Sequence, residues 1–486
     1  MKIKNTIFVI ALLSASLFTP GCKDDLNIVQ NSRISSANMW QDEQDVRSAV
    51  FGMFDYFRTT FKSNLLYWGE YRNGLWGPGT NGVLHSGDMA AVLSGTMNST
   101  NAYADWTNLY TTINQANLII KYANLTTISQ EGKDFALANA YFTRAFCYFW
   151  VARIWGDAPL ATKGFENATD NLYLAKSTQS AILQQVEADI KSAEASMKAT
   201  SNAKTSANPA ALSMLKADFG LWMYGAAKAG DSYLALAETG IQSLGLNASQ
   251  LETNYADIFS SANKSGKEVI FSIFQENGES VGGFAIDQFW NRSYLKPEFI
   301  NTAVPISENQ WWCFNRNYIN LILSDSADQR APVTYGHGPY GTTGGEIGWA
   351  NKFAGEMISG TRVFDSNIII YRYAQAYLFD AEIKYYRKNY SAALTSLGVI
   401  TNRAYGKQNY YTDPSDAAVL NAIITENLKE FASEGNTWWT LVRTNKIWDY
   451  NSSLAKQMTK KNILLWPITQ SALNRNFNLT QTEGWQ

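Results

Sequence analysis

The sequence predicts a mostly α-helical fold, with a scaffold of tetratricopeptide-like helical pairs, long irregular aromatic-rich loops and minor β-structure. Three observations predict it. Apolar residues recur at three- and four-residue steps over much of the chain, two stretches have the pattern helix, short turn, helix, and only short segments such as EVIFSIF have the composition of strands. The 486 residues are 46% hydrophobic, which is enough for a large core.

The first 21 residues have the pattern of a bacterial lipoprotein signal peptide. A positively charged start precedes an apolar run, residues 7–18, which is shorter than the ~20 residues that a membrane-spanning helix needs. The run ends at Cys22, which is the expected lipidation site, although Thr19 and Pro20 depart from the usual lipobox. Residues 1–21 are therefore expected to be a leader that is removed.

A polar tether, residues 22–35, follows the leader. Its Lys-Asp-Asp at 23–25 resembles the tag with which Bacteroidetes export lipoproteins to the outer face of the outer membrane. We therefore expect a protein anchored by lipid in the outer membrane and facing the extracellular side.

The rest of the chain, residues 36–486, is expected to form one domain. Its helical periodicity predicts helices at about 105–123, 133–155, 178–198, 208–228, 231–244, 367–388, 390–404 and 416–434. The predicted scaffold comprises about 36–63, 105–244 and 366–486, and the loop-rich segments comprise about 64–104 and 245–365. Long irregular segments on a helical scaffold are usually functional or disordered, and the many tryptophans of these two favour order.

Composition and motifs argue against several function classes. The formal charge is −2 with no basic block, so nucleic-acid binding is not expected. GPGTNG and GHGPYG match a dinucleotide motif, but neither follows a strand or opens a helix. His85 and His337 are too few for a histidine zinc cluster, and Cys147 and Cys313 lack the spacing of a disulfide framework or a metal site. We expect no catalytic residue and no cofactor; scattered Asp and Asn allow a structural calcium ion but do not indicate one.

Four stretches, in order, resemble the SusD/RagB family: NAYFTRAFCYFWVARIWGDAPL (139–160), IIIYRYAQAYLFDAE with ITNRAYG (368–382, 400–406), IITENLKEFASEGNTWWTLVR (423–443) and ILLWPITQSALNRNFNLTQTEGW (463–485). The resemblance implies a surface lipoprotein with a tetratricopeptide-like core. It also implies a role as the binding lid of a SusC-like TonB-dependent transporter, which receives glycans or, in some branches, peptides.

The third stretch departs from the family pattern. Asn427 and Thr437 stand where arginines are usual, and Thr440 stands where aspartate is common. We therefore doubt an ion-pair lock in this corner, which packing of Trp438 and Trp439 would replace.

A neutral oligosaccharide needs aromatic platforms beside planar donors and acceptors, and the two loop-rich segments contain both. The candidate ligand-binding residues are Arg72, Trp76, Asn81, Trp290, Tyr294, Trp311 and Trp312, with Glu70, Asn73, Asn291, Arg292 and Tyr318 beside them. Adjacent tryptophans in an extended chain point to opposite faces, so at most one of the pair at 311–312 is expected to contact ligand. Arg72 either serves a ligand hydroxyl or pairs with Glu70.

The main hypothesis is a surface lipoprotein that binds an oligosaccharide and delivers it to its transporter partner. Three alternatives remain: the same role for peptides, an adaptor that binds only protein through its helical repeats, and a secreted glycosidase. A peptide is the less favoured ligand, because a site that binds peptide termini would be expected to carry more charge. The loop tryptophans speak against the adaptor, and no spacing among the 42 acidic residues marks a catalytic pair.

Overall fold

The computed structural model describes residues 39–79, 86–167, 169–199, 203–279, 284–288, 290–291, 306–307, 310–340, 345–359 and 361–485. Residues Asp42–Gln486 form one compact unit. The predicted lipidation site, Cys22, lies outside the described residues.

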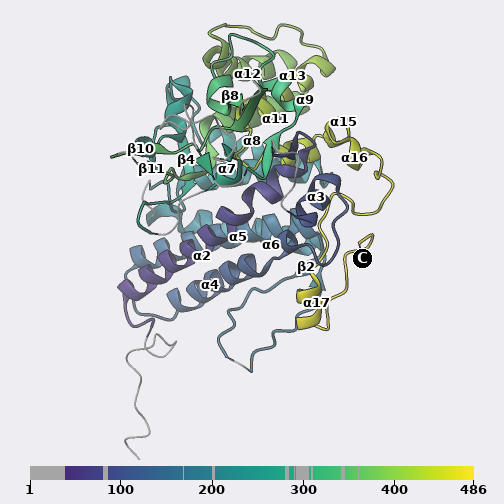
Figure 1. Ribbon diagram of the computed structural model, residues 1–486. Coiled ribbons are helices and arrows are strands. Elements are labelled where there is room, and N and C mark those ends of the chain that lie inside the picture. Colours follow the sequence, from purple (N-terminus) through teal and green to yellow (C-terminus); the bar gives the residue numbers. More distant parts are fainter. Residues whose placement is uncertain are drawn as a thin grey trace, which may run out of the picture. The chain divides into compact units, whose positions relative to one another are not determined.

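Four long helices form the first part of the scaffold: α2 (Glu43–Gly69), α4 (Thr107–Ala123), α5 (Gln130–Trp155) and α6 (Gln179–Ser196). Helix α5 contacts the other three, and they lie side by side in Figure 1. Its second half is buried all round, because RAFCYFW presents apolar atoms in every direction. The Ser129 hydroxyl caps the start of α5, and Gly156 with φ 73° ends it.

The second part of the scaffold contains the predicted helical pairs. They are α7 (Pro209–Gly225) with α8 (Asp231–Gln242), and α11 (Tyr373–Tyr386) with α12 (Tyr390–Tyr405), against which α13 (Asp416–Phe431) packs. Helices α7 and α8 approach closely at two glycines: a Cβ on Gly220 would lie 2.5 Å from the Tyr233 carbonyl oxygen, and one on Gly240 would lie 2.6 Å from that of Ser213. Contacts of α11 with α7 and α8 join the two pairs, which confirms the predicted fold class.

The strands are short and pair two by two: β1 (Trp76–Pro78) with β7 (Trp312–Phe314), β2 (Ala158–Pro159) with β3 (Lys176–Ser177), β4 (Val269–Ile273) with β12 (Ile368–Arg372), β5 (Trp290–Asn291) with β6 (Ile306–Ser307), β8 (Tyr335–Tyr340) with β9 (Gly345–Ala350), and β10 (Glu356–Ile358) with β11 (Thr361–Val363). All pairs are antiparallel except β5–β6, which is parallel. The EVIFSIF prediction is confirmed by β4.

The shorter helices are α3 (Gly87–Ser94), α9 (Arg316–Ile322), α10 (Ala331–Thr334), α14 (Thr437–Arg443), α15 (Ile447–Tyr450), α16 (Ser452–Ala455) and α17 (Gln470–Arg475). Two predicted boundaries were wrong. Helix α2 continues to Gly69 and α3 lies inside the early loop-rich segment. Residues 368–372, predicted as helix, form β12, because the β-branched run Ile-Ile-Ile pairs with β4.

The core is unusually aromatic, and it includes Trp68, Trp155 and Trp466 at 0% exposure. Among the described residues, no helix has both the length and the apolar character needed to cross a membrane.

Candidate functional site

The two loop-rich segments, far apart in sequence, meet at the β1–β7 pair. Trp76 lies opposite Phe314 and Pro78 lies opposite Trp312. The Gly79 N–H extends the pairing by donating to the Trp311 carbonyl at 3.0 Å. The structure therefore brings together the two regions from which the candidate ligand-binding residues were chosen.

The inner face of this junction is part of the core. The Trp312 ring stacks on Tyr71 with centroids 3.9 Å apart, and its Nε1 donates to the Tyr67 hydroxyl at 3.3 Å. The Trp76 ring packs against Phe314 at 4.5 Å. Trp76 and Trp312 are 4% and 0% exposed, so the prediction that they form an exposed platform is corrected: both rings fill the interior.

Arg72 is also buried, and its contacts are structural. Its Nη2 donates to the Ile463 carbonyl at 2.7 Å and Nη1 to the Leu464 carbonyl at 3.0 Å. The guanidinium lies over the Trp438 ring at 4.7 Å and forms no ion pair with Glu70 or with any other described carboxylate. Burial lowers the Arg72 pKa to about 9. Arg72 holds the C-terminal loop in place, so neither predicted role for it is seen.

Glu70 joins the early loop to the loop after α13. Its carboxylate accepts hydrogen bonds from the Trp76 indole at 3.4 Å and from the backbone N–H groups of Ser433 and Gly435 at 3.3 and 3.2 Å. Burial raises the pKa of Glu70 to about 7 against the opposing effect of these donors. Asn73, beside it, donates to the Thr437 hydroxyl at 3.0 Å.

The outer face of the junction carries Trp311, which is half-buried, whereas Pro78, exposed at the end of β1, lies on the same face as its partner Trp312. Trp311 packs against the core from its edge, whereas Trp312 is fully buried, and alternation along an extended chain accounts for this difference in burial. Next to them, the Gln310 amide donates to the carbonyls of Gln288 and Gly348 at 3.2 and 2.9 Å, which ties β7 to the segments on either side.

For the other candidates, the structure describes the backbone only or does not describe the residue at all. The backbone of Trp290 lies in β5, paired with Ile306, whereas Asn81 and Tyr294 lie outside the described residues. The side chains of Asn291 and Arg292 are also not described. Tyr318 is buried at 0% exposure, and its hydroxyl donates to the Leu428 carbonyl at 2.8 Å, so its predicted place in the ligand site is corrected.

Two further rings near the junction were missed as candidates. Tyr335, half-buried, lies 6.4 Å from the Phe314 ring and stacks on the exposed His337 with centroids 6.0 Å apart. Both rings lie in the β8 sequence YGHGPY. Its glycines and proline are typical of a turn, so the sequence does not predict a strand here.

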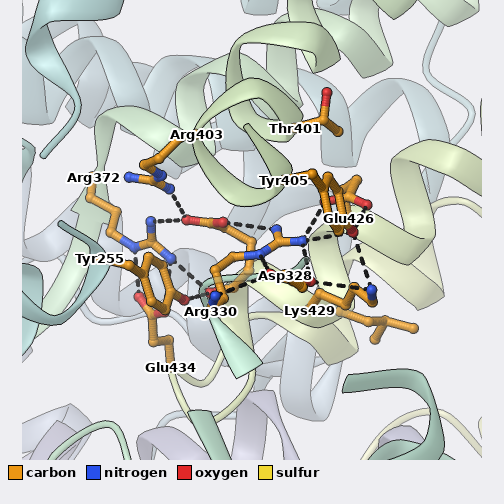
Figure 2. Close-up of polar contacts among 12 residues, drawn as sticks. Tyr255, Asp328, Arg330, Arg372, Thr401, Arg403, Tyr405, Glu426, Lys429 and Glu434 are labelled. Atoms are coloured by element: carbon orange, nitrogen blue, oxygen red, sulfur yellow. Dashed lines mark hydrogen bonds and ion pairs between the residues drawn. The ribbon is translucent and has the colours of Figure 1, made fainter. Parts of the chain in front are cut away.

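Behind the junction lies a buried network of charges (Figure 2), which sequence reasoning did not find. It contains five acids and five bases: Glu268, Asp328, Glu426, Glu430, Glu434, Arg330, Lys352, Arg372, Arg403 and Lys429. Arg372 binds Glu434 through two parallel bonds of 2.8 and 2.9 Å and also donates to Glu430 at 2.6 Å. Three arginines around Glu430 hold the pKa of that carboxyl well below its usual range.

The doubt about an ion-pair lock in the third stretch was wrong. Asn427, Thr437 and Thr440 are indeed uncharged, but the acids come from neighbouring positions four residues apart on and just after α13. A second buried pair, Arg443 with Glu382, joins α14 to α11 through bonds of 2.8 and 2.7 Å. Trp438 and Trp439 pack here as expected, at 1% and 3% exposure.

Fold and site together define a helical-hairpin scaffold whose two long insertions meet at one short strand pair. The SusD-like model described as "Starch-binding associating with outer membrane" matches residues 80–217, and the SusD family model matches residues 334–485. The chain belongs to the SusD/RagB family.

Similar proteins cover nearly the whole chain. SusD-like protein P38 of Formosa agariphila is 26% identical over 99% of both chains. A SusD superfamily protein from Bacteroides fragilis superposes with a TM-score of 0.80 at 24% identity, covering 92% of this chain and 100% of its own. A laminarin-binding SusD-like protein superposes with a TM-score of 0.73 at 20% identity, again covering 92% and 100%.

Proposed function

We propose that this protein is a cell-surface lipoprotein that binds an oligosaccharide nutrient at the β1–β7 junction and delivers it to a SusC-like TonB-dependent transporter. The observation that carries the proposal is the meeting of the two aromatic loop-rich segments at β1–β7, with the half-buried Trp311 on its outer face. Family membership and the similarity to a laminarin-binding protein favour a glycan as ligand. SusD-like proteins are binding proteins rather than enzymes, so we expect no turnover of the ligand.

Titration calorimetry with a panel of neutral oligosaccharides, laminarin fragments included, tests ligand binding. Trp311→Ala removes the indole ring on which a sugar would stack. Binding should weaken about tenfold or more, because the sugar then loses much of its apolar contact area with the protein. Trp448→Ala is the matched control, since Trp448 is also half-buried but lies elsewhere, on α15. Equal affinity of the Trp311 variant and the wild-type protein would contradict the proposed site.

The proposed anchor is tested in cells. Protease added to intact bacteria should remove the wild-type protein from the surface, and Cys22→Ala should abolish its attachment to the outer membrane. Protection from protease until the outer membrane is broken would contradict the extracellular orientation. A transporter partner should co-purify from solubilised outer membranes, and an interface above ~2,000 Å² would fit a permanent complex.

A further inference from the structure

A cavity lies between the end of α5, helices α7, α14 and α15, and the loop 458–465, and none of the lining residues belongs to β1 or β7. Its volume is about 760 Å³. Three tryptophans line it, Trp222, Trp438 and Trp448, together with Arg153 and Lys460. Lys461, also in the lining, forms an ion pair with Glu483, and none of the described residues that line the cavity is acidic.

Arg153 is the unusual member of this lining. It is 2% exposed, and its described hydrogen bond runs from Nη1 to Asp218 at 3.2 Å. Its Nε has no hydrogen-bond partner, and Nη2 donates to no described residue. The pairing edge of the guanidinium, which consists of Nε and Nη2, is therefore unused by the described part of the chain.

Other buried arginines of this protein show what that edge binds. Arg144, Arg330, Arg372 and Arg443 each direct Nε and Nη2 to the two oxygens of one carboxylate, with distances of 2.6 to 2.9 Å. This bidentate arrangement is the geometry in which a guanidinium recognises a carboxylate. Arg153 differs from these arginines, because it reaches its carboxylate, Asp218, through Nη1 alone, and it also lines a cavity.

Several donors near Arg153 have no acceptor among the described residues. The indole nitrogens of Trp150 and Trp439 have no hydrogen-bond partner, and their rings lie 5.0 and 4.4 Å from the Arg153 Cζ. Lys460 adds a positive charge and lies 4.1 Å from the Trp485 ring. A buried group of unmatched donors favours a ligand that brings acceptor oxygens.

The wall of the cavity is held from behind. Arg72 binds the carbonyls of Ile463 and Leu464 on the far side of the loop 458–465, which fixes that loop against Trp438. A wall held in this way is already formed before a ligand arrives, which lowers the entropic cost of binding.

We propose that this cavity binds a ring-shaped organic carboxylate, whose oxygens accept hydrogen bonds from the guanidinium of Arg153 while its ring lies against the tryptophans. The ring belongs either to a sugar acid or to an aromatic acid, because both combine an apolar ring face with a carboxylate. This site shares no lining residue with the β1–β7 junction, so it stands independently of the function proposed there.

Titration calorimetry on the mature protein tests the site with two acids and their neutral counterparts: glucuronate against glucose, and benzoate against benzyl alcohol. We expect at least one acid to bind about tenfold more tightly than its counterpart, because charged hydrogen bonds are lost with the carboxylate. Binding of glucuronate alone assigns a sugar acid, and binding of benzoate alone assigns an aromatic acid. Equal affinity for acid and neutral compound, or no binding of either acid, overturns the proposal.

Variants then assign the binding to this cavity. Arg153→Gln should lower the affinity for the acid about tenfold or more, and Lys460→Ala should lower it by a smaller factor that disappears at high salt. Trp311→Ala is the control and should bind the acid as the wild-type protein does. If circular dichroism shows that Arg153→Gln does not fold, Trp448→Ala on the surface decides, and unchanged affinity in that variant overturns the proposal.

Discussion

Glu70 shows how a single side chain connects the candidate site to the scaffold. It lies directly after α2 and accepts hydrogen bonds from the loop that follows α13, so it holds together segments more than 360 residues apart. Arg72, two residues further, holds the C-terminal loop through its carbonyl oxygens. Polar residues that look like ligand contacts in the sequence are therefore the fixed base on which the β1–β7 junction rests.

The raised pKa of Glu70 makes a prediction about pH. A carboxyl group whose folded-state pKa is about 7, against about 4.3 when unfolded, binds more protons in the folded state, so its contribution to stability falls as the pH rises. The unfolding free energy of the wild-type protein minus that of Glu70→Gln should therefore decrease by about 3 kcal/mol between about pH 4 and pH 7.5. Urea unfolding of both proteins in the same buffers measures this difference, and a flat or rising difference would contradict it.

Residue type alone could not predict that Trp76 and Trp312 are buried whereas Trp311 is only half-buried. A tryptophan in a glycine-rich loop suggests exposure, but the loop folds back as β1 and places Trp76 against Phe314. The alternation of adjacent residues in an extended chain predicts that at most one of Trp311 and Trp312 contacts ligand, and only Trp311 is more than slightly exposed. Which one faces outward depends on the partner strand, and the local sequence does not contain that information.

At the scale of elements, α13 organises the buried charges. Glu426 and Glu430 lie one turn apart on the helix, and Glu434 follows its end with the same spacing. Each pairs with bases from other elements: Glu426 with Arg330, Glu430 with Arg372 and Arg403, and Glu434 with Arg372 and Lys352. The four-residue spacing of the glutamates is visible in the sequence and could have indicated a shared face, but their partners come from distant segments.

Breaking this network should destabilise the fold strongly. Arg372→Met leaves three buried carboxylates without one of their cations and should lower the unfolding free energy by about 3–5 kcal/mol. Lys191→Met is the control, because its pair with Glu187 is on the surface of α6, and it should cost less than about 1 kcal/mol. Similar urea midpoints for the two variants would show that the network contributes little.

The helices of the scaffold could be predicted more fully than the loops. The expected helix at 231–244 is α8, Asp231–Gln242, and that at 390–404 is α12, Tyr390–Tyr405. Their apolar periodicity and turn residues are local signals. The strand pairs join segments such as β1 and β7, more than 230 residues apart, and no local pattern specifies such a pairing.

At the scale of the whole molecule, a rigid helical scaffold carries one junction of two long insertions. The family models match the predicted blocks in order, and the Bacteroides fragilis and laminarin-binding structures each cover 92% of the chain. The scaffold explains why the inner face of the junction is so completely packed. Its aromatic core and buried charges fix β1 and β7, so the outer face is presented in a defined geometry.

A crystal structure of the protein with a bound neutral oligosaccharide tests the central claim most directly. We predict that the sugar lies on the outer face of the β1–β7 pair in contact with the Trp311 ring, with Trp76 and Trp312 still buried beneath it. An ordered oligosaccharide found only at another surface, with Trp311 free of contact, would contradict the account.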